Sequence, residues 1–384
     1  MKILFFIQDL GMGGVVRQIS ILSEHLARRG HDVSVLALYT MNQNWKLIWK
    51  LDSIDVQSLL IQHPAGVLSA GVKLIKATLE LRNLLKRGNI QILYSYQGHV
   101  ARFISWLATR GVANTRLIWS IQGSGQRNTL YRNDWKVSLP FHLCRWVSVS
   151  IPLMIANSEA GYAHRKASGS HCINQLVVDN GFDTDKFKPD PEARTRVPSE
   201  WKIKDEKLIG VVARLAPSKG HPTFLDAAAL LSKERKDLRF VIVGDGPRDY
   251  LGKLQLLSQE LVVSDHIMWV GAREDMSAIY NALDILCSSS YTEGFPNVIG
   301  EAMACGVPCV VTDVGDSAKI VGDEGIVVPP ANPQMLAKGL RAMLLKLSDI
   351  KPYQIRDRIV KHFTIESMVD KTEKILIETY GNVK

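Results

Sequence analysis

The most informative part of this 384-residue chain is Glu293-Gly-Phe-Pro-Asn-Val-Ile-Gly-Glu301-Ala-Met-Ala-Cys-Gly-Val-Pro308. Pro296 suits the first position of a helix and Gly306 the position just after one, which predicts a short helix over 297–305. The free N–H groups at the start of such a helix bind phosphate or hydroxyl oxygens. Glu293 and Glu301 would contact two separate parts of a sugar nucleotide. The alternative is a capping carboxylate and a solvated helical glutamate.

Two cations lie five residues apart in a second segment, Gly210-Val-Val-Ala-Arg214-Leu-Ala-Pro-Ser-Lys219-Gly220. This segment follows a predicted strand and leads into a predicted helix. Arg214 and Lys219 at the carboxyl end of a buried strand suit a diphosphate, because they neutralise its charge and stabilise it as a leaving group. Taken as loop cations alone, they would equally fit a surface pair.

A glycine-rich loop, Gly11-Met-Gly13-Gly14, follows the first predicted strand. Glycines there let the backbone approach a ligand, and the helix that follows favours anions at its start. A dinucleotide fingerprint would need a third glycine where Val16 stands, so NAD binding is disfavoured. The alternative is an ordinary tight turn.

Strand and helix patterns alternate in both halves of the chain, which predicts an α/β protein with two doubly wound domains. We expect an N-terminal domain over 1–182, a proline-containing linker over 183–207, a C-terminal domain over 208–364 and a last helix over about 365–384. The predicted strands are 2–7, 33–38, 90–95, 116–121, 153–156, 208–213, 239–243, 266–270, 284–288 and 308–312. The predicted helices besides 297–305 and the last are 16–29, 70–87, 99–110, 223–232 and 276–283.

The composition is that of a globular protein, with 46% apolar and 22% charged residues. The apolar run at the N-terminus is too short for a secretory signal, and the longest later one, near 147–156, is well short of the ~20 residues of a membrane span. The five cysteines form no CxxC pair, which favours a reduced, cytoplasmic protein without a zinc site.

Positive charge is concentrated in the first half. Residues 1–180 hold 20 Lys and Arg against 9 Asp and Glu, a net of +11, whereas the remainder holds 27 against 29, a net of −2. The excess fits a solvated surface, an anionic acceptor or contact with an anionic membrane, such as the inner face of the cytoplasmic membrane. Nucleic acid is disfavoured, because no nucleic-acid-binding motif accompanies the charge.

The motifs quoted above resemble the signature of the family 4 retaining glycosyltransferases, also called glycosyltransferase group 1. Further matching pieces follow in the family's order along the chain: Gly13-Gly14 with Arg17, Ala156-Asn-Ser-Glu159, Val178-Asp-Asn-Gly-Phe-Asp-Thr-Asp-Lys-Phe-Lys-Pro189, Val243-Gly-Asp-Gly-Pro247 and Thr312-Asp-Val-Gly315. The ordered set is specific for the family, but not for one sugar.

The resemblance implies the GT-B fold, in which two Rossmann-like domains face an interdomain cleft and the last helix packs back on the N-terminal domain. The donor would be a nucleotide diphosphate sugar, with a UDP-sugar favoured, bound by the C-terminal domain; the acceptor would be a glycan or lipid-linked molecule bound by the N-terminal domain. The reaction would retain the anomeric configuration, as in other hexosyltransferases of this kind, and use no metal or other cofactor.

The resemblance also assigns roles to single residues. Arg214 and Lys219 would bind the donor diphosphate, Glu293 the hydroxyls of the sugar and Glu301 those of the ribose. The backbone around Phe295, Pro296, Asn297 and Val298 would bind sugar and phosphate oxygens, the loop at Gly13 and Gly14 would close over the diphosphate, and the backbone near Arg273 would contact the base.

Departures from the family pattern fall mostly in the acceptor half. Val15 and Val16 precede Arg17 where an acidic residue is frequent, and Gln122 stands where a histidine is common beside the donor sugar. Glutamine still forms hydrogen bonds but carries neither the proton nor the charge of histidine. Arg17, Tyr96 and His99 are the acceptor-side candidates, and Gln122 joins Glu293, Arg214 and Lys219 as a catalytic candidate. In the donor half, Lys319 replaces a frequent acidic residue.

The function expected from these features is sugar transfer in the synthesis of a cell-surface polysaccharide, lipopolysaccharide or glycolipid. The alternatives are a sugar-nucleotide epimerase of the same fold and a non-catalytic sugar-nucleotide-binding protein. Asp183-Thr-Asp185 resembles a metal-binding DxD motif, but it belongs to the Asn-Gly-Phe-Asp-Thr piece of the family pattern, and no metal site is expected there. Trp45 and Trp49 lie in an apolar, partly basic patch that fits core packing or a membrane anchor.

Overall fold

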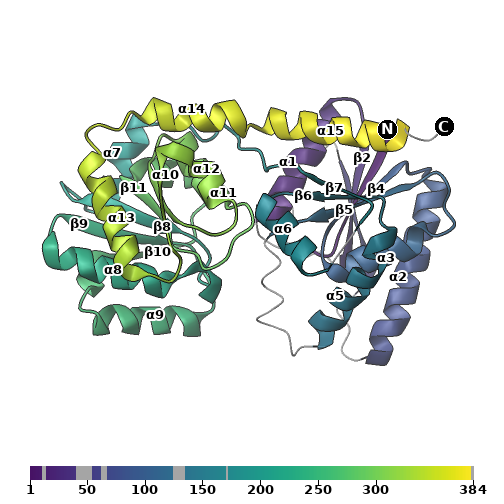
Figure 1. The fold of residues 1–384 in the computed structure, drawn as a ribbon, viewed down its shortest axis with the longest axis horizontal. Helices are drawn as coiled ribbons and strands as arrows, with labels where there is room; N and C mark the ends of the chain where they lie inside the picture. Colours follow the sequence, from purple (N-terminus) through teal and green to yellow (C-terminus); the bar gives the residue numbers. More distant parts are fainter. Residues whose placement is uncertain (11–13, 40–53, 62–66, 124–134, 170–171, 382–384) are drawn as a thin grey trace. The chain divides into compact units, whose positions relative to one another are not determined.

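The computed structural model describes residues 1–10, 14–39, 54–61, 67–123, 135–169 and 172–381 (Figure 1). The chain forms two compact units, which we call unit 1 and unit 2. Unit 1 comprises Met1–Gly181 together with Ile365–Lys384, and unit 2 comprises Phe182–Thr364. Gly13, Trp45 and Trp49 lie outside the described residues.

Unit 1 is built on a sheet of seven parallel strands in the order β3-β2-β1-β4-β5-β6-β7. The interior strands are continuous apolar runs, as expected for strands that are covered on both faces. Their bounds are β1 Lys2–Ile7, β2 Asp32–Tyr39, β3 Asp55–Ile61, β4 Ile92–Gln97, β5 Arg116–Ile121, β6 Leu153–Ala156 and β7 Asn174–Val177.

Alternate residues of β1 point to two different helical layers. Leu4 and Phe6 share a buried cluster with α2 (Val67–Arg87), α3 (His99–Thr109) and α5 (Trp135–Val147). Ile3, Phe5 and Ile7 pack instead with α1 (Gly14–Arg28) and α15 (Ile365–Gly381). Helix α3 lies between α2 and α5 in the first of these layers. The remaining helix of unit 1 is α6 (Glu159–Ala167).

Unit 2 repeats the architecture with six parallel strands in the order β10-β9-β8-β11-β12-β13. Helices α8, α9 and α13 cover one face, and α7, α10, α11, α12 and α14 the other. The strands are β8 Lys207–Val212, β9 Leu238–Val243, β10 Ile267–Gly271, β11 Ile285–Ser288, β12 Cys309–Thr312 and β13 Ile326–Val328. The helices are α7 Pro191–Glu200, α8 His221–Glu234, α9 Arg248–Glu260, α10 Met276–Ala282, α11 Asn297–Ala304, α12 Ser317–Val321, α13 Pro333–Lys346 and α14 Pro352–His362.

Each sheet has a point where the strand order reverses. In unit 1 it lies between β1 and β4, and in unit 2 between β8 and β11. At such a point the loops that leave the two neighbouring strands run in opposite directions and open a crevice at their carboxyl ends, where doubly wound proteins bind ligands. The candidate segments 213–220 and 289–296 are the loops that leave β8 and β11.

The predicted doubly wound α/β architecture is confirmed, with local differences. Strands β3, β7 and β13 were not predicted from the sequence, and each of these lies at an edge of its sheet. The segment 183–207, expected to be a linker, belongs to unit 2 and contains α7, which packs on α10. Asp190 caps α7 by accepting a hydrogen bond from the backbone N–H of Ala193, and Pro191 occupies the first turn. Because proline is tolerated there, a proline that was expected to belong to a linker instead starts a helix.

The last helix packs on the N-terminal unit, as predicted. Val369 and Leu376 of α15 are fully buried in the same cluster as Phe5 and Ile19. On the polar side, the Glu373 carboxylate lies 2.6 Å from Arg29 and 2.7 Å from His31. Where the chain passes between units, the Phe182 N–H donates to the carbonyl oxygen of Phe363 over 2.8 Å, so the two crossing segments are paired.

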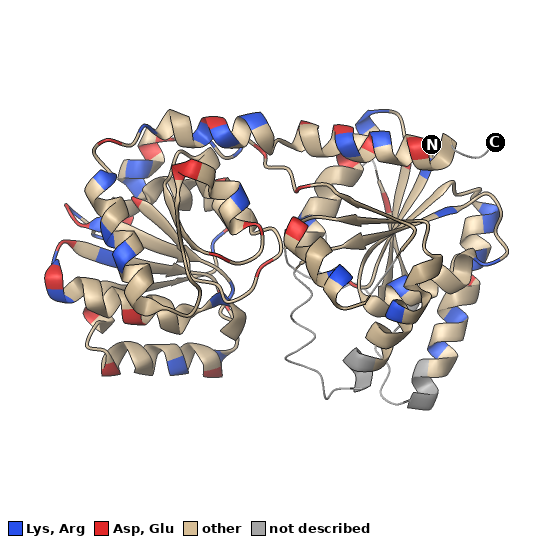
Figure 2. Ribbon diagram, viewed as in Figure 1, with Lys and Arg blue, Asp and Glu red and all other residues tan. Residues whose placement is uncertain are grey.

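Positive charge in unit 1 is prominent on the layer of α2, α3 and α5. Figure 2 shows Lys and Arg along α2, which has five of them and one acidic residue, Glu80. Neither α3 nor α5 contains an acidic residue. None of the helices in the described ranges combines the length and the hydropathy that crossing a bilayer requires.

Candidate functional site

The loops after β8 and β11 lie against each other. Gly220 adopts a left-handed conformation (φ 65°), and a Cβ atom there would lie 1.9 Å from the carbonyl oxygen of Ser289. The Ser289 hydroxyl donates to the carbonyl oxygen of Lys219 over 3.1 Å, and the Tyr291 N–H donates to that of Ser218 over 2.9 Å. Glycine is needed at position 220 for its positive φ and for this close approach.

This contact brings two predicted site residues together. The Nζ of Lys219 lies 2.6 Å from Oε1 of Glu293, and the two side chains are 22% and 12% exposed. The Ser290 hydroxyl donates to the same carboxylate oxygen over 2.7 Å. Because the pair is partly shielded from water, its electrostatic interaction is stronger than that of an exposed pair. Ser290 was not predicted as a site residue, although three consecutive serines directly at the end of a buried strand were a usable signal.

Arg214 contributes a second cation at the carboxyl end of β8. Its backbone is fixed by neighbours: the Ala213 N–H donates to Val243 over 3.0 Å, and the Leu215 N–H donates to Asp245 over 2.9 Å. The residue is exposed, and it forms no ion pair with any other residue that the structure describes. Arg214 therefore offers an accessible guanidinium in the same loop as Lys219.

The start of α11 follows Glu293. The helix runs over Asn297–Ala304, within one residue of the prediction, and no side chain caps its N-terminus. Phe295 is only 6% exposed, and its ring stacks on Phe182 and contacts Phe363. Pro296 is buried as well, whereas Asn297 and Val298 are partly exposed. The contribution of this segment to a ligand would therefore come mainly from its backbone, as predicted.

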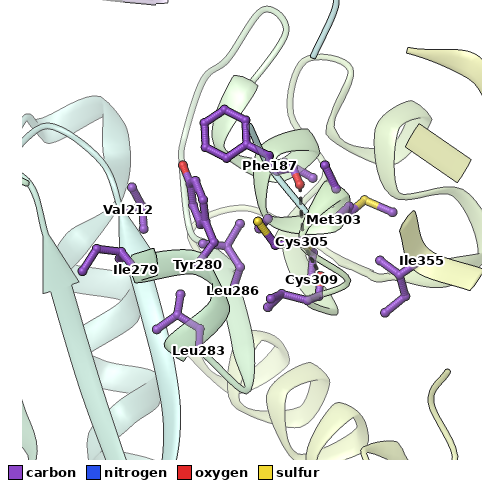
Figure 3. Packing of buried hydrophobic residues seen from close by; sticks show 14 of the residues in the cluster. Phe187, Val212, Ile279, Tyr280, Leu283, Leu286, Met303, Cys305, Cys309 and Ile355 are labelled. Atoms are coloured by element: carbon purple, nitrogen blue, oxygen red, sulfur yellow. Dashed lines mark hydrogen bonds between the residues drawn. The ribbon is translucent and has the colours of Figure 1, made fainter. Parts of the chain in front are cut away.

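Glu301 lies on the inner side of α11 and is 4% exposed. Its Oε2 accepts a hydrogen bond from the Tyr280 hydroxyl of α10 over 2.8 Å. Figure 3 shows the Tyr280 ring among the buried side chains between α10 and α11, beside Phe187. Tyr280 was not among the predicted site residues, because nothing in the sequence distinguishes it from an ordinary core aromatic.

Replacing Tyr280 by phenylalanine is expected to lower the free energy of unfolding by about 1–3 kcal/mol, since the buried Glu301 carboxylate loses a donor. Tyr291→Phe is the matched control, because it removes the contact of the Tyr291 hydroxyl with Thr223 (2.8 Å) on a side chain that is exposed. Denaturant unfolding of both variants tests this. An equal, small loss in the two would contradict the importance of the Tyr280–Glu301 contact.

Arg273 lies in the loop after β10, and its side chain is engaged locally. Its Nε and Nη2 donate to the Asp275 carboxylate over 2.8 and 2.7 Å. The hydrogen bonds from Arg273 lower the pKa of Asp275. The Gly244 N–H donates to the carbonyl oxygen of Gly271 over 2.8 Å, so this loop is joined to the one after β9. The structure thus leaves the backbone of this loop, rather than the Arg273 side chain, for the predicted contact with the base.

The candidates of unit 1 gather at the carboxyl ends of β4 and β5. Tyr96 is 3% exposed and packs on Phe5. Burial raises the pKa of Tyr96, and a hydrogen bond with Gln122 partly opposes this. The Gln122 amide donates to the Ser120 hydroxyl over 2.7 Å. Tyr96 is therefore placed to position Gln122 from the core.

The other unit 1 candidates lie at helix starts. His99 is the first residue of α3, and its ring contacts Phe141 at 5.4 Å. Gly14 is the first residue of α1, and Arg17 lies in its first turn, partly buried. Since β1 and β4 are neighbours, the starts of α1 and α3 belong to the point where the unit 1 strand order reverses.

Two buried arginines near these residues were not predicted from the sequence. Arg102 of α3 donates to the carbonyl oxygen of Ser120, and Arg165 of α6 lies over the Phe141 ring. Burial, together with the positive charge of Arg165, lowers the pKa of Arg102 to about 9. No carboxylate of the described residues forms an ion pair with either arginine. Uncompensated buried charge is unfavourable, so this region is suited to an anion.

The remaining candidates have structural contacts. Asp183 accepts hydrogen bonds from the backbone N–H groups of Asp185 and Lys186 at 3.2 and 2.9 Å, as a turn residue does. Within the described ranges, no cluster of three or more His, Cys, Asp or Glu is arranged to hold a metal. Cys305 and Cys309 are free and buried, as expected, and burial raises the pKa of Cys305 to about 12. The Lys319 ammonium lies 3.9 Å from the Asp316 carboxylate.

A cavity of about 540 Å³ lies elsewhere in unit 2. Its lining includes Lys207 at the start of β8, Asp284 just before β11 and Pro308 just before β12. These residues mark the amino ends of the strands, opposite the edge where Lys219 and Glu293 lie. The cavity is therefore not part of the candidate site.

Comparison with known proteins defines the class. The chain superposes on a structure of HepE from Anabaena solved with UDP and glucose, with a TM-score of 0.81 and 21% identity, over 98% of this chain and 99% of the other. The chain has the GT-B fold. Residues 12–186 match the model described as Glycosyltransferase Family 4, and residues 206–346 match that of glycosyl transferases group 1. The chain belongs to the family 4, or group 1, glycosyltransferases.

Curated relatives are more distant in length or identity. The chain is 33% identical over 159 residues to a GDP-mannose-dependent alpha-(1-6)-phosphatidylinositol monomannoside mannosyltransferase of Mycolicibacterium smegmatis, a match covering 38% of this chain and 41% of that protein. It thus spans less than half the length of this relative. It is 25% identical to a human protein of the phosphatidylinositol N-acetylglucosaminyltransferase, over 95% of this chain and 73% of that protein.

Proposed function

We propose that this chain transfers a sugar from a nucleoside diphosphate donor to a glycan or lipid-linked acceptor, with retention of the anomeric configuration. The observation that carries the proposal is the Lys219–Glu293 pair at the reversal point of the unit 2 sheet, followed directly by the uncapped start of α11. A cation, a carboxylate and free backbone N–H groups within one loop pair suit the diphosphate and sugar parts of one ligand.

In this proposal, Arg214 and Lys219 bind the diphosphate, and Glu293 accepts hydrogen bonds from sugar hydroxyls. Lys219 already lies against Glu293, so a bound donor would be held by two side chains that position each other. Ser290 fixes the carboxylate from its other side. Glu301 binds the ribose hydroxyls, and Tyr280 orients its carboxylate.

The proposed reaction is attack by an acceptor hydroxyl on the same face from which the leaving group departs. The bond from the acceptor oxygen to the anomeric carbon forms as the bond from that carbon to the phosphate oxygen breaks. The hydroxyl proton passes to an oxygen of the departing diphosphate. Arg214 and Lys219 stabilise the negative charge that develops there, a role that does not require a protein nucleophile or a metal ion.

The proposed acceptor is anionic, and the proposed process is the synthesis of a cell-surface polysaccharide, lipopolysaccharide or glycolipid in the cytoplasm. The buried Arg102 and Arg165, which have no carboxylate partner among the described residues, support an anionic acceptor in unit 1. The names of the two curated relatives, both of which refer to phosphatidylinositol compounds, support a lipid-linked acceptor. We propose a UDP-sugar donor over a GDP-sugar.

Thermal unfolding with UDP, GDP, ADP or CMP, each with magnesium and with a chelator, tests the donor half of the proposal. A ligand that binds only the folded chain raises the unfolding temperature by mass action. We expect UDP to stabilise the wild type equally in both conditions and to leave Lys219→Ala unchanged. Stabilisation by none of the nucleotides would contradict the donor site, and stabilisation only with magnesium would contradict metal independence.

A further inference from the structure

The outer side of the α2–α3–α5 layer of unit 1 exposes an unusual number of large apolar side chains. The inner side of the layer is already buried on the sheet through residues such as Ala77, Leu81 and Val147. The outer residues therefore have no role in that core. They are 50% to 72% exposed, and they comprise Val72, Ile75, Leu79, Leu139, Trp146 and Val149, the last in a short turn of helix over Ser148–Ser150.

These side chains are arranged, not scattered. Val72, Ile75 and Leu79 follow a spacing of three and four residues, which places them in one stripe along α2. At the other side of the layer, the Trp146 ring packs edge to face on Trp106 of α3, with their centroids 6.4 Å apart. Contiguous exposed apolar surface on a folded protein marks an interaction site.

Cations border the apolar side chains. Lys76 is two-thirds exposed and pairs with Glu80, 3.7 Å away, the one acidic residue of the three helices. The Arg110 guanidinium lies 4.7 Å over the Trp106 ring. Figure 2 shows the basic residues along α2. The cations that border this face are Lys73, Lys76, Arg82, Lys86, Arg87, Arg110 and Arg145.

We propose that this face, defined by the six exposed apolar residues and seven cations named above, binds the surface of an anionic membrane. Apolar side chains and tryptophan enter the boundary between headgroups and acyl chains, while lysine and arginine contact anionic headgroups. A near absence of acidic residues suits a uniformly negative surface, whereas a protein partner normally presents charges of both signs. The inference concerns binding alone and stands independently of the proposed sugar transfer.

Cosedimentation of the full chain with vesicles tests this. We expect the wild type to pellet with vesicles of phosphatidylcholine and phosphatidylglycerol, to pellet much less with phosphatidylcholine alone, and to be released by high salt. Ile75→Ser with Leu79→Ser, and separately Trp146→Ser with Val149→Ser, should lower the vesicle partition coefficient at least about tenfold. Lys76→Glu with Arg87→Glu should abolish the preference for the anionic lipid.

The matched control is Leu256→Ser with Leu345→Ser, which removes two apolar side chains of unit 2 that are 59% and 74% exposed. It should pellet like the wild type. All positions are exposed, so unchanged thermal unfolding verifies that each variant is folded. Equal pelleting of the wild type and the two unit 1 apolar variants would overturn the proposal. So would a wild-type dimer, seen by gel filtration without vesicles, that Ile75→Ser with Leu79→Ser converts to a monomer, because the face would then be covered by a second copy.

Discussion

Lys219→Ala is expected to lower kcat/KM for sugar transfer by about 10³-fold or more, because it removes a cation from the leaving group as negative charge develops. It also removes the partner that holds Glu293 at 2.6 Å, so the sugar-binding carboxylate loses its position. The fold should persist, since Ser289 contacts the backbone rather than the side chain of Lys219. Initial rates against a verified acceptor measure the effect.

Lys233→Ala is the control for Lys219→Ala. Lys233 is an exposed lysine near the end of α8, the helix that Lys219 precedes, so its loss changes the net charge equally and leaves the site intact. It should retain wild-type activity. A Lys219→Ala variant that keeps more than about a tenth of the wild-type kcat/KM would show that the charge of the leaving group is stabilised elsewhere.

Val369→Asp should unfold unit 1. Val369 is fully buried between α15 and the sheet, and a carboxylate there has no partner to offset its desolvation. The expected loss in the free energy of unfolding exceeds about 4 kcal/mol. Ile377→Asp lies on the same helix at a residue that is 52% exposed, and should change the stability little. Denaturant unfolding of both variants measures this, and comparable losses would mean that the core role of α15 is wrong.

Much of the fold could be predicted because its central strands are continuous apolar runs. Residues 2–7 and 116–121 were predicted with the bounds that the structure has. The strands that escaped prediction lie at sheet edges: β7 alternates between exposed and partly buried residues, and β13 is only three residues long. Edge strands are half solvated, so they lack the apolar run that identifies a strand in sequence.

The donor site was more predictable than the acceptor site. Arg214, Lys219 and Glu293 lie in loops directly after buried strands, and the strand positions alone bring such loops to one edge of the sheet. Ser290 and Tyr280 act on these residues through side-chain contacts between loops or helices distant in sequence, which no local pattern records. In unit 1, the roles of Tyr96 and Arg102 depend on burial, which a single polar residue in a strand or helix does not disclose.

The position of α15 has a consequence for how the protein is made. Every strand of the unit 1 sheet emerges from the ribosome before residue 182, but the helix that covers the Ile3, Phe5 and Ile7 face emerges last. Unit 2 is continuous in sequence and can complete its core earlier. During synthesis, one face of the first sheet therefore stays open while about half of the chain is still being translated. Such an exposed apolar face is a site where nascent chains recruit chaperones or aggregate.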